Sequence, residues 1–153
     1  KRAVAFTSRL DMPVESEKLL VIRPKNLILG IGCKRGTGSR AIKDAVEVFM
    51  RKNKRSMLSL KKVASIDLKE NEKGILEFCS EMGLDFYAVP RDEIRKEEDR
   101  FETSDFVRKT VGVGSVAEAC AVLGGRKTKL ICGKTVCGGI TLALAEEEVA
   151  FYI

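Results

Sequence analysis

The stretch GIGCKRGTG at residues 30–38 directly follows a run of large apolar residues, and this succession constrains the fold more than any other feature. The short apolar run predicts a buried strand at Leu27–Ile31. A buried strand, a glycine-rich turn and an amphipathic helix together predict an α/β fold with parallel strands. The helix is predicted from apolar residues at the spacing of one helix face: Ala41, Ile42, Ala45, Val46 and Phe49.

Strands and helices continue to alternate along the chain. This order predicts a three-layer α/β/α sandwich around a mostly parallel, mixed central sheet of about five strands. The further predicted elements are a strand at Val63–Asp67, a helix marked by Ile75, Phe78, Cys79 and Met82 that Gly83 ends, a strand at Leu84–Val89, an exposed helix and loop at 91–103, a brief helical turn at 106–112, a helix beginning at Ser115, and strands at Lys129–Cys132 and Ile140–Ala145.

The first 25 residues are irregular and contain two prolines. We therefore interpret residues 1–25 as a linker or the tail of a preceding domain, with a short strand at Leu19–Ile22, and residues 26–153 as one α/β domain. Since the chain begins without Met, we expect it to be a piece of a longer protein. No apolar run is long enough for a membrane helix or a signal peptide, so we expect a cytoplasmic location.

Charge and histidine content limit the chemistry. The 28 Lys and Arg residues against 22 Asp and Glu give a net charge of +6, which suits nucleic acid, a phosphorylated ligand or a polycarboxylate, or is ordinary surface charge. The complete absence of histidine excludes Ser-His-Asp triads, Cys-His pairs and histidine-ligated metals. The five cysteines form no CxxC pair and predict reduced thiols.

The glycine stretch fits nucleotide-binding motifs poorly. Its G-x-G-x-x-x-G spacing is one residue longer than the dinucleotide fingerprint, and the acid at the end of the second predicted strand, Asp67, lies beyond the customary spacing of about twenty residues. A phosphate-binding loop ending at Gly133-Lys134-Thr135 is rejected because Thr128 stands at its first glycine position, and because a strand is predicted between them.

An anion cradle is the reading that remains. Glycines let backbone N–H groups approach a ligand, while Lys34 and Arg35 add full charges. The stretch Val111–Ser115 repeats the arrangement, with two glycines before a helix that Ser115 and Glu118 are expected to cap. Two such turns predict a ligand with several carboxylates or phosphates. The alternative is that both are only tight strand-to-helix turns.

Side chains near these turns are candidate catalytic groups. Beside two cations and a helix N-terminus, Cys33 is expected to have a lowered thiol pKa and act as a nucleophile, or else to be a small packed thiol. Ser65, Asp67 and Lys69 alternate at the end of the second strand, so we expect them to share a face. Asp67 then orients water or holds a ligand, or it caps the next segment.

Three motifs in this order resemble the C-terminal domain of the cobalamin biosynthesis protein CbiG: LGIGCKRGT (29–37), ASIDLKENEKGI (64–75) and VGVGSVAEACAVL (111–123). The stand-alone relative CobE consists of essentially this domain. The resemblance covers roughly residues 20–146 and implies a role in the anaerobic route to vitamin B12.

The resemblance implies hydrolysis of cobalt-precorrin-5A to cobalt-precorrin-5B, in which the δ-lactone opens and acetaldehyde leaves. It implies no dissociable cofactor and no metal site, since cobalt arrives within the substrate, and neither a nucleic-acid nor a membrane partner. Full-length CbiG has additional N-terminal regions, so a CobE-like domain that binds corrinoid intermediates without turnover is the alternative. A nucleotide-binding regulatory domain is a third reading, and a homodimer is left open.

The resemblance and the two turns together suggest the residues of the site. We expect Asp67, Cys33 and Ser65 to be catalytic, with Asp67 orienting the attacking water. The residues expected to bind substrate carboxylates or the lactone oxyanion are Gly30, Gly32, Lys34, Arg35, Gly36, Gly112, Gly114, Ser115 and Lys134.

Overall fold

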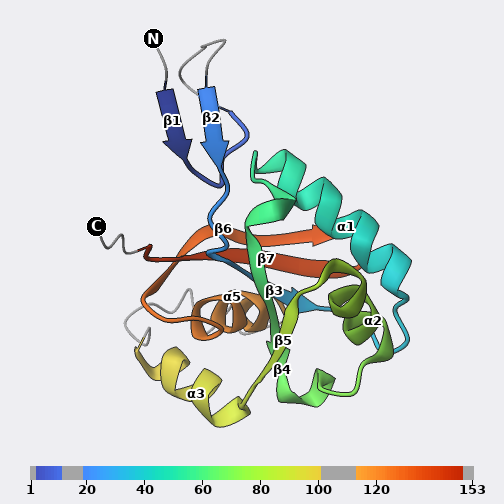
Figure 1. The fold of residues 1–153 in the computed structure, drawn as a ribbon. Coiled ribbons are helices and arrows are strands. Elements are labelled where there is room, and N and C mark those ends of the chain that lie inside the picture. Colours follow the sequence, from blue (N-terminus) through green and yellow to red (C-terminus); the bar gives the residue numbers. More distant parts are fainter. Residues whose placement is uncertain (1–2, 12–18, 101–112, 150–153) are drawn as a thin grey trace.

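The computed structural model describes residues 3–11, 19–100 and 113–149. Its centre is a five-stranded sheet in the order β5-β4-β3-β7-β6 (Figure 1). The predicted number of central strands is confirmed. The strands are β3 (Leu27–Gly32), β4 (Leu60–Ile66), β5 (Asp85–Val89), β6 (Thr128–Cys137) and β7 (Ile140–Glu147).

The sheet is mixed, as predicted. β3, β4 and β5 are parallel, whereas β7 lies between β3 and β6 and is antiparallel to both. β6 therefore runs in the same direction as β3. As a result, the C-terminal ends of β3, β4, β5 and β6 meet at one edge of the sheet, which we call the carboxyl edge.

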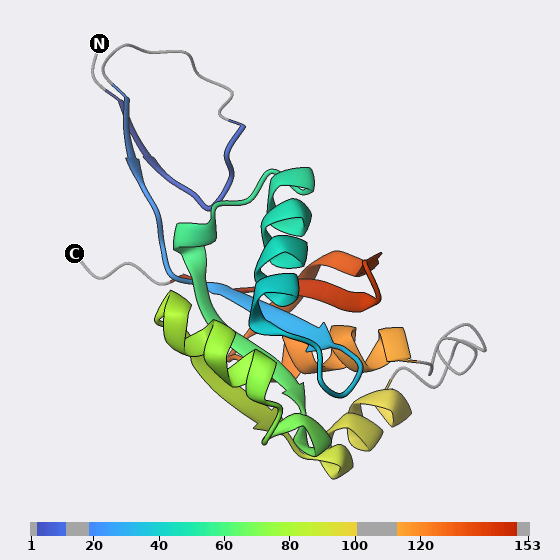
Figure 2. The same cartoon turned by 90° about the vertical axis from the view of Figure 1, so that its right-hand side faces the viewer.

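Helices cover both faces of the sheet and give the predicted three layers (Figure 2). On one face, α1 (Ser39–Lys52) and α2 (Lys73–Met82) pack against β3 through Phe49, Phe78 and Leu29. On the other, α3 (Arg91–Arg100) and α5 (Val113–Leu123) contribute Ile94 and Ala117 to a second core. The two cores arise because successive side chains of a strand point to opposite faces.

Close backbone contact places α5 on the sheet. A Cβ at Gly30 of β3 would overlap the carbonyl oxygen of Ala117, and a Cβ at Gly124 would lie 2.6 Å from Ile28 Cγ2. Ala117 therefore lies over the later part of β3, and Gly124, just beyond the helix, lies over its earlier part. α5 runs antiparallel to β3, with its N-terminus toward the carboxyl edge.

The N-terminal residues form a separate two-stranded sheet, which we call the N-terminal ribbon. It consists of β1 (Ala3–Phe6) and β2 (Leu19–Ile22), which pair in parallel and project away from the sandwich (Figure 1). The strand predicted at Leu19–Ile22 is confirmed, whereas β1 was not predicted.

Several predicted boundaries are wrong. The strand predicted at Val63–Asp67 is β4, which spans Leu60–Ile66. α5 begins at Val113, so Ser115 lies in its first turn and does not cap it. β6 extends to Cys137 because it pairs along its length with β7, and the turn between them, Gly138-Gly139, has φ of +56° and +80°. The turn predicted at 106–112 lies outside the described residues. Within the described part of the chain, no helix is both long and apolar enough to cross a membrane.

Candidate active site at the carboxyl edge

Loops and helix N-termini converge at the carboxyl edge. The loops after β3, β4 and β5 emerge there and lead to α1, α2 and α3, and α5 also points its N-terminus to this edge. Figure 2 shows the β3–α1 loop, the start of α5 and the β6–β7 turn on the same, right-hand side of the molecule. Helix N-termini carry partial positive charge and unpaired N–H groups, so this edge favours anions.

The β3–α1 loop (residues 33–38) presents two cations to solvent. Both the N–H and Oγ1 of Thr37 donate to the carbonyl oxygen of Lys34, at 3.2 and 2.6 Å, which closes a turn. Gly36 within this turn has φ of +84°, a left-handed conformation that favours glycine. Lys34 and Arg35 are exposed, as expected for residues that bind an anionic ligand.

Glu72 holds this loop, a role that the sequence did not reveal. The Gly36 N–H, which we expected to face a ligand, donates to Glu72 Oε1 at 2.8 Å. The other carboxylate oxygen lies 3.8 Å from Lys69 Nζ, and the two side chains are only 11% and 21% exposed. The Gly36 N–H is thus already hydrogen-bonded to the largely buried Glu72 carboxylate.

Gly74 lets the loop lie directly on the start of α2. A Cβ at this position would overlap the carbonyl oxygen of Thr37. Both Glu72 and Gly74 belong to the ASIDLKENEKGI motif, so the motif that carried the resemblance also holds the loop in place. In the sequence, this motif was the one indication that these residues matter, and it did not reveal that Gly74 contacts Thr37.

The thiol of Cys33 does not have the expected lowered pKa. Cys33 is 8% exposed, and its burial raises the pKa of the thiol, with a smaller increase from Glu72. Lys69 and a hydrogen bond with Thr37 act in the opposite direction but do not overcome burial. The structure therefore favours the packed-thiol alternative for Cys33, because a thiol with a raised pKa is a poor nucleophile at neutral pH.

Ser65 lies beneath the site, inside the sheet. Its side chain is fully buried, and its hydroxyl donates to the carbonyl oxygen of Ile31 at 2.7 Å, which links β4 to β3. The expectation that Ser65 and Asp67 share a strand face is wrong, because β4 ends at Ile66 and Asp67 begins a short 3-10 helix, η2 (Asp67–Lys69). Ser65 supports the edge and does not reach its surface.

Asp67 lies at the carboxyl edge, with both of its carboxylate oxygens close to Arg91. Its Oδ2 accepts the N–H of Arg91 at 3.3 Å, where α3 begins, whereas the sequence suggested a cap only for the segment that directly follows Asp67. Its Oδ1 lies 3.1 Å from Arg91 Nε without hydrogen-bond alignment, and this buried oxygen has no hydrogen-bond partner. Burial raises the pKa of Cys120 on α5 to about 12, and the negative charge of Asp67 makes a smaller contribution in the same direction.

Lys134 lies farther from the loop than its sequence context suggested. It is exposed on β6, where its N–H donates to Glu118 Oε1 of α5 at 2.8 Å. β6 is two strands from β3 in the sheet, a separation of about 10 Å at ordinary strand spacing. Lys134 is thus beside the edge but not in contact with the β3–α1 loop.

The remaining predicted residues are glycines and Ser115. Gly30 contacts α5 as described above, and Gly32 is buried at the end of β3. Gly114 and Ser115 lie in the first turn of α5, and Gly112 lies outside the described residues. Across residues 3–11, 19–100 and 113–149, no three His, Cys, Asp or Glu side chains gather in a way that would hold a metal ion.

Comparison with known proteins identifies relatives of this fold and site. The family model described as "Cobalamin synthesis G C-terminus" matches residues 27–145. A cobalt-precorrin-5A hydrolase of Priestia megaterium is 33% identical over 147 residues, which cover 94% of this chain and 39% of the relative. The chain spans less than half the length of each curated relative that it matches.

Solved structures share the fold. The structure of CobE, a protein from the cobalamin (vitamin B12) biosynthetic pathway, has a TM-score of 0.66 and 29% identity, and the match covers 80% of this chain and 91% of CobE. A putative cobalamin biosynthesis protein G homolog from Sulfolobus solfataricus has a TM-score of 0.60 and 19% identity, and its match covers 96% of this chain but 51% of that one.

Proposed function

We propose that this chain, which belongs to the cobalamin synthesis G C-terminus family, acts in cobalamin biosynthesis by hydrolysing cobalt-precorrin-5A. The observation that supports this most directly is the carboxyl edge itself. Exposed Lys34 and Arg35 lie there on a fixed loop, and the partly exposed carboxylate of Asp67 lies at the same edge of the sheet. The relative from Priestia megaterium bears the name of this activity.

The substrate of such a hydrolase carries several acetate and propionate groups. Lys34 and Arg35 suit these carboxylates, since a hydrogen bond between charged groups contributes about 1.5–3 kcal/mol. Because the Gly36 N–H is taken by Glu72, the loop binds through its cationic side chains and not through this amide. A Cβ at Gly36, Gly138 or Gly139 would meet nothing within 4 Å, so the loop and the β6–β7 turn are uncovered at these positions.

For the reaction, we infer that the Asp67 carboxylate accepts a proton from the attacking water, because this side chain lies at the carboxyl edge and is 31% exposed. The water oxygen then adds to the lactone carbonyl carbon, and the ring C–O bond breaks to leave a carboxylate. Lys34 or Arg35 stabilises the developing oxyanion. The alkoxide freed from the lactone, on the carbon extruded by ring contraction, becomes the carbonyl of acetaldehyde as the C–C bond from this carbon to the macrocycle breaks. The electron pair of that bond passes to the macrocycle, which takes up a proton, and no dissociable cofactor is required.

The test is acetaldehyde release from cobalt-precorrin-5A, together with the visible spectrum of the bound substrate. Asp67→Asn should still bind the corrinoid but lose at least about 100-fold in rate, in the range for a general base. Asp85→Asn is the matched control, since Asp85 is exposed at the start of β5, at the opposite edge. An unchanged rate in Asp67→Asn would exclude Asp67 as the base.

A corrinoid-binding domain without turnover is the second candidate. It is favoured by the near-complete match to CobE, a protein of about this domain's extent. Spectral binding that depends on Lys34 and Arg35, without acetaldehyde release, would support it. A chain that binds nucleotide tightly but no corrinoid would refute both candidates.

A further inference from the structure

Lys69 is a partly buried cation at the carboxyl edge that the proposed chemistry does not use. It ends the short helix η2, which directly follows β4, and its side chain is 21% exposed. Its positive charge acts to lower the pKa of the Cys33 thiol, and Cys33 directly follows β3. Because β3 and β4 are neighbours in the sheet, the Lys69 ammonium lies near the C-terminal ends of both strands.

The position of Lys69 is fixed by its own turn of the chain and by Glu72. The N–H of Glu72 donates to the Lys69 carbonyl oxygen at 3.0 Å, so the two residues belong to one turn. The Glu72 carboxylate accepts the Gly36 N–H with one oxygen, and its other oxygen lies 3.8 Å from Lys69 Nζ. One largely buried carboxylate therefore ties the cation to the β3–α1 loop.

The Lys69 ammonium has hydrogen-bond donors that the described chain does not use. A separation of 3.8 Å makes an ion pair but is too long for a hydrogen bond, and the ammonium donates no other hydrogen bond within residues 3–11, 19–100 and 113–149. In these residues, the buried side-chain atoms without a hydrogen-bond partner belong to Asn26, Ser59 and Asp67, so the Lys69 ammonium reaches solvent. Its N–H groups are therefore available to a ligand.

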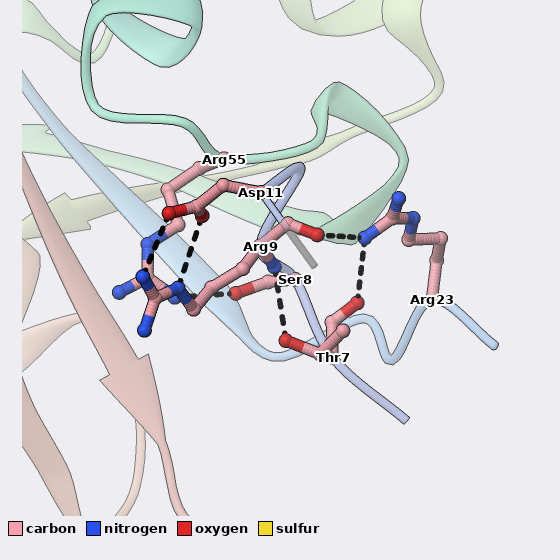
Figure 3. A network of polar contacts seen from close by, with 6 residues as sticks. All are labelled: Thr7, Ser8, Arg9, Asp11, Arg23 and Arg55. Atoms are coloured by element: carbon pink, nitrogen blue, oxygen red, sulfur yellow. Dashed lines mark hydrogen bonds and ion pairs between the residues drawn. The ribbon is translucent and has the colours of Figure 1, made fainter. Parts of the chain in front are cut away.

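Three other partly buried cations donate hydrogen bonds within the protein. At the base of the N-terminal ribbon, Arg55 donates to Ser8 Oγ at 2.9 Å, and Arg23 donates to two main-chain carbonyl oxygens (Figure 3). Lys62 of β4 donates to a main-chain carbonyl oxygen at 2.9 Å. These hydrogen bonds give each of the three cations a structural role, whereas Lys69 makes none of this kind.

Partial burial makes Lys69 a better anion-binding group than the two cations of the β3–α1 loop. Lys34 and Arg35 are exposed, so salt screens their charges and a ligand must order their side chains. The interaction between two charges is stronger where the protein excludes water. Glu72 offsets part of the Lys69 charge, but it is hydrogen-bonded to the loop. A ligand carboxylate that reaches Lys69 therefore meets a cation that is already in place.

We propose that Lys69 binds one carboxylate of the substrate within the carboxyl edge and thereby places the macrocycle relative to Asp67, an inference that rests on the proposed function. Asp67 and Lys69 are the first and last residues of η2, so a substrate held at Lys69 is held two residues from the proposed base. Lys34 and Arg35 bind further carboxylates at the surface. Lys69 thus determines the orientation of the substrate, and the exposed cations add affinity.

The test is a visible-spectrum titration of the chain with two probes: a cobalt corrinoid with free acetate and propionate side chains, and the same corrinoid with these side chains amidated. Lys69→Gln should weaken binding of the carboxylate probe about 10- to 100-fold, as expected for the loss of a hydrogen bond between charged groups. It should change binding of the amide probe far less, because an amide carries no charge. Lys52→Gln, at an exposed cation in the last turn of α1, removes the same charge at the opposite edge and should leave both affinities unchanged.

Trypsin cleavage at Lys34 and Arg35 reports whether the loop is intact in Lys69→Gln, and it should be unchanged because Glu72 still accepts the Gly36 N–H. An equal loss of affinity for both probes would overturn the inference, since it would show a structural role. Unchanged binding of the carboxylate probe in Lys69→Gln would also overturn it and leave the proposed function in place. Binding that depends on Lys69 without acetaldehyde release would support the inference and refute hydrolysis. A chain that binds neither probe would refute both.

Discussion

Removing the carboxylate of Glu72 should release the β3–α1 loop from the start of α2. Glu72→Ala deletes the hydrogen bond from the Gly36 N–H, which is 2.8 Å long and involves a side chain only 11% exposed. A hydrogen bond to a charged group contributes about 1.5–3 kcal/mol, and 1.4 kcal/mol is a factor of ten. The open loop should therefore become about 10- to 100-fold more populated.

Trypsin measures this opening directly, because Lys34 and Arg35 lie within the loop. When opening is fast relative to cleavage, the cleavage rate follows the population of the open state. We expect Glu72→Ala to be cut at these residues about 10- to 100-fold faster than the unmodified protein. Glu72→Gln, which keeps an oxygen acceptor, should fall between the two.

The matched control is Glu77→Ala on the same helix. Glu77 pairs with Lys73 at 3.7 Å, but the two side chains are 47% and 89% exposed, and surface pairs of this kind contribute little. Cleavage in Glu77→Ala should match that of the unmodified protein. An unchanged rate in Glu72→Ala, or an equal increase in Glu77→Ala, would refute the reasoning.

Three further predictions concern the loop and the opposite edge. Gly74→Ala forces its new Cβ against the Thr37 carbonyl oxygen, which should cost about 1–3 kcal/mol, seen as a lower Tm. Alkylation of Cys33 should reach half its maximal rate at a pH above that of a free cysteine, because burial raises its pKa; mass spectrometry of the Cys33 peptide reads this out. For Glu147, burial opposes ionisation, but the hydrogen bond from Lys61 at 2.7 Å helps to lower its pKa below the ordinary value. This contribution to stability is present at neutral pH and is lost as pH falls through the lowered pKa, so denaturant titrations of the unmodified protein and Glu147→Gln should converge in acid.

The sequence predicted most of the sandwich because its signals are local. The apolar run before GIGCKRGTG became β3, and Gly83, predicted to end a helix, follows α2 with φ of +66°. Each signal depends on residues within one or two turns of each other. The helix start at Val113 was missed because a Ser-x-x-Glu pattern was read as a cap, whereas the helix continues one turn further back.

The site was less predictable because its contacts join distant parts of the chain. Glu72 and Gly36 are 36 residues apart, and no spacing rule links an acid before one helix to an amide before another. The thiol pKa of Cys33 was expected from its neighbours in sequence, two cations. In the structure, burial of Cys33 raises this pKa, and burial depends on contacts that the neighbouring sequence does not show. Arg91 beside Asp67 was missed for the same reason.

The backbone contact between Gly30 and Ala117 sets a fixed length at the carboxyl edge. From this contact, β3 rises about 10 Å to Cys33, and α5 rises about 6 Å to Val113. Side chains that repack elsewhere on α5 cannot alter this geometry, because two main chains touch at the contact. A ligand that contacts both the β3–α1 loop and the start of α5 must therefore be long enough to span this fixed separation, whichever charged groups it carries.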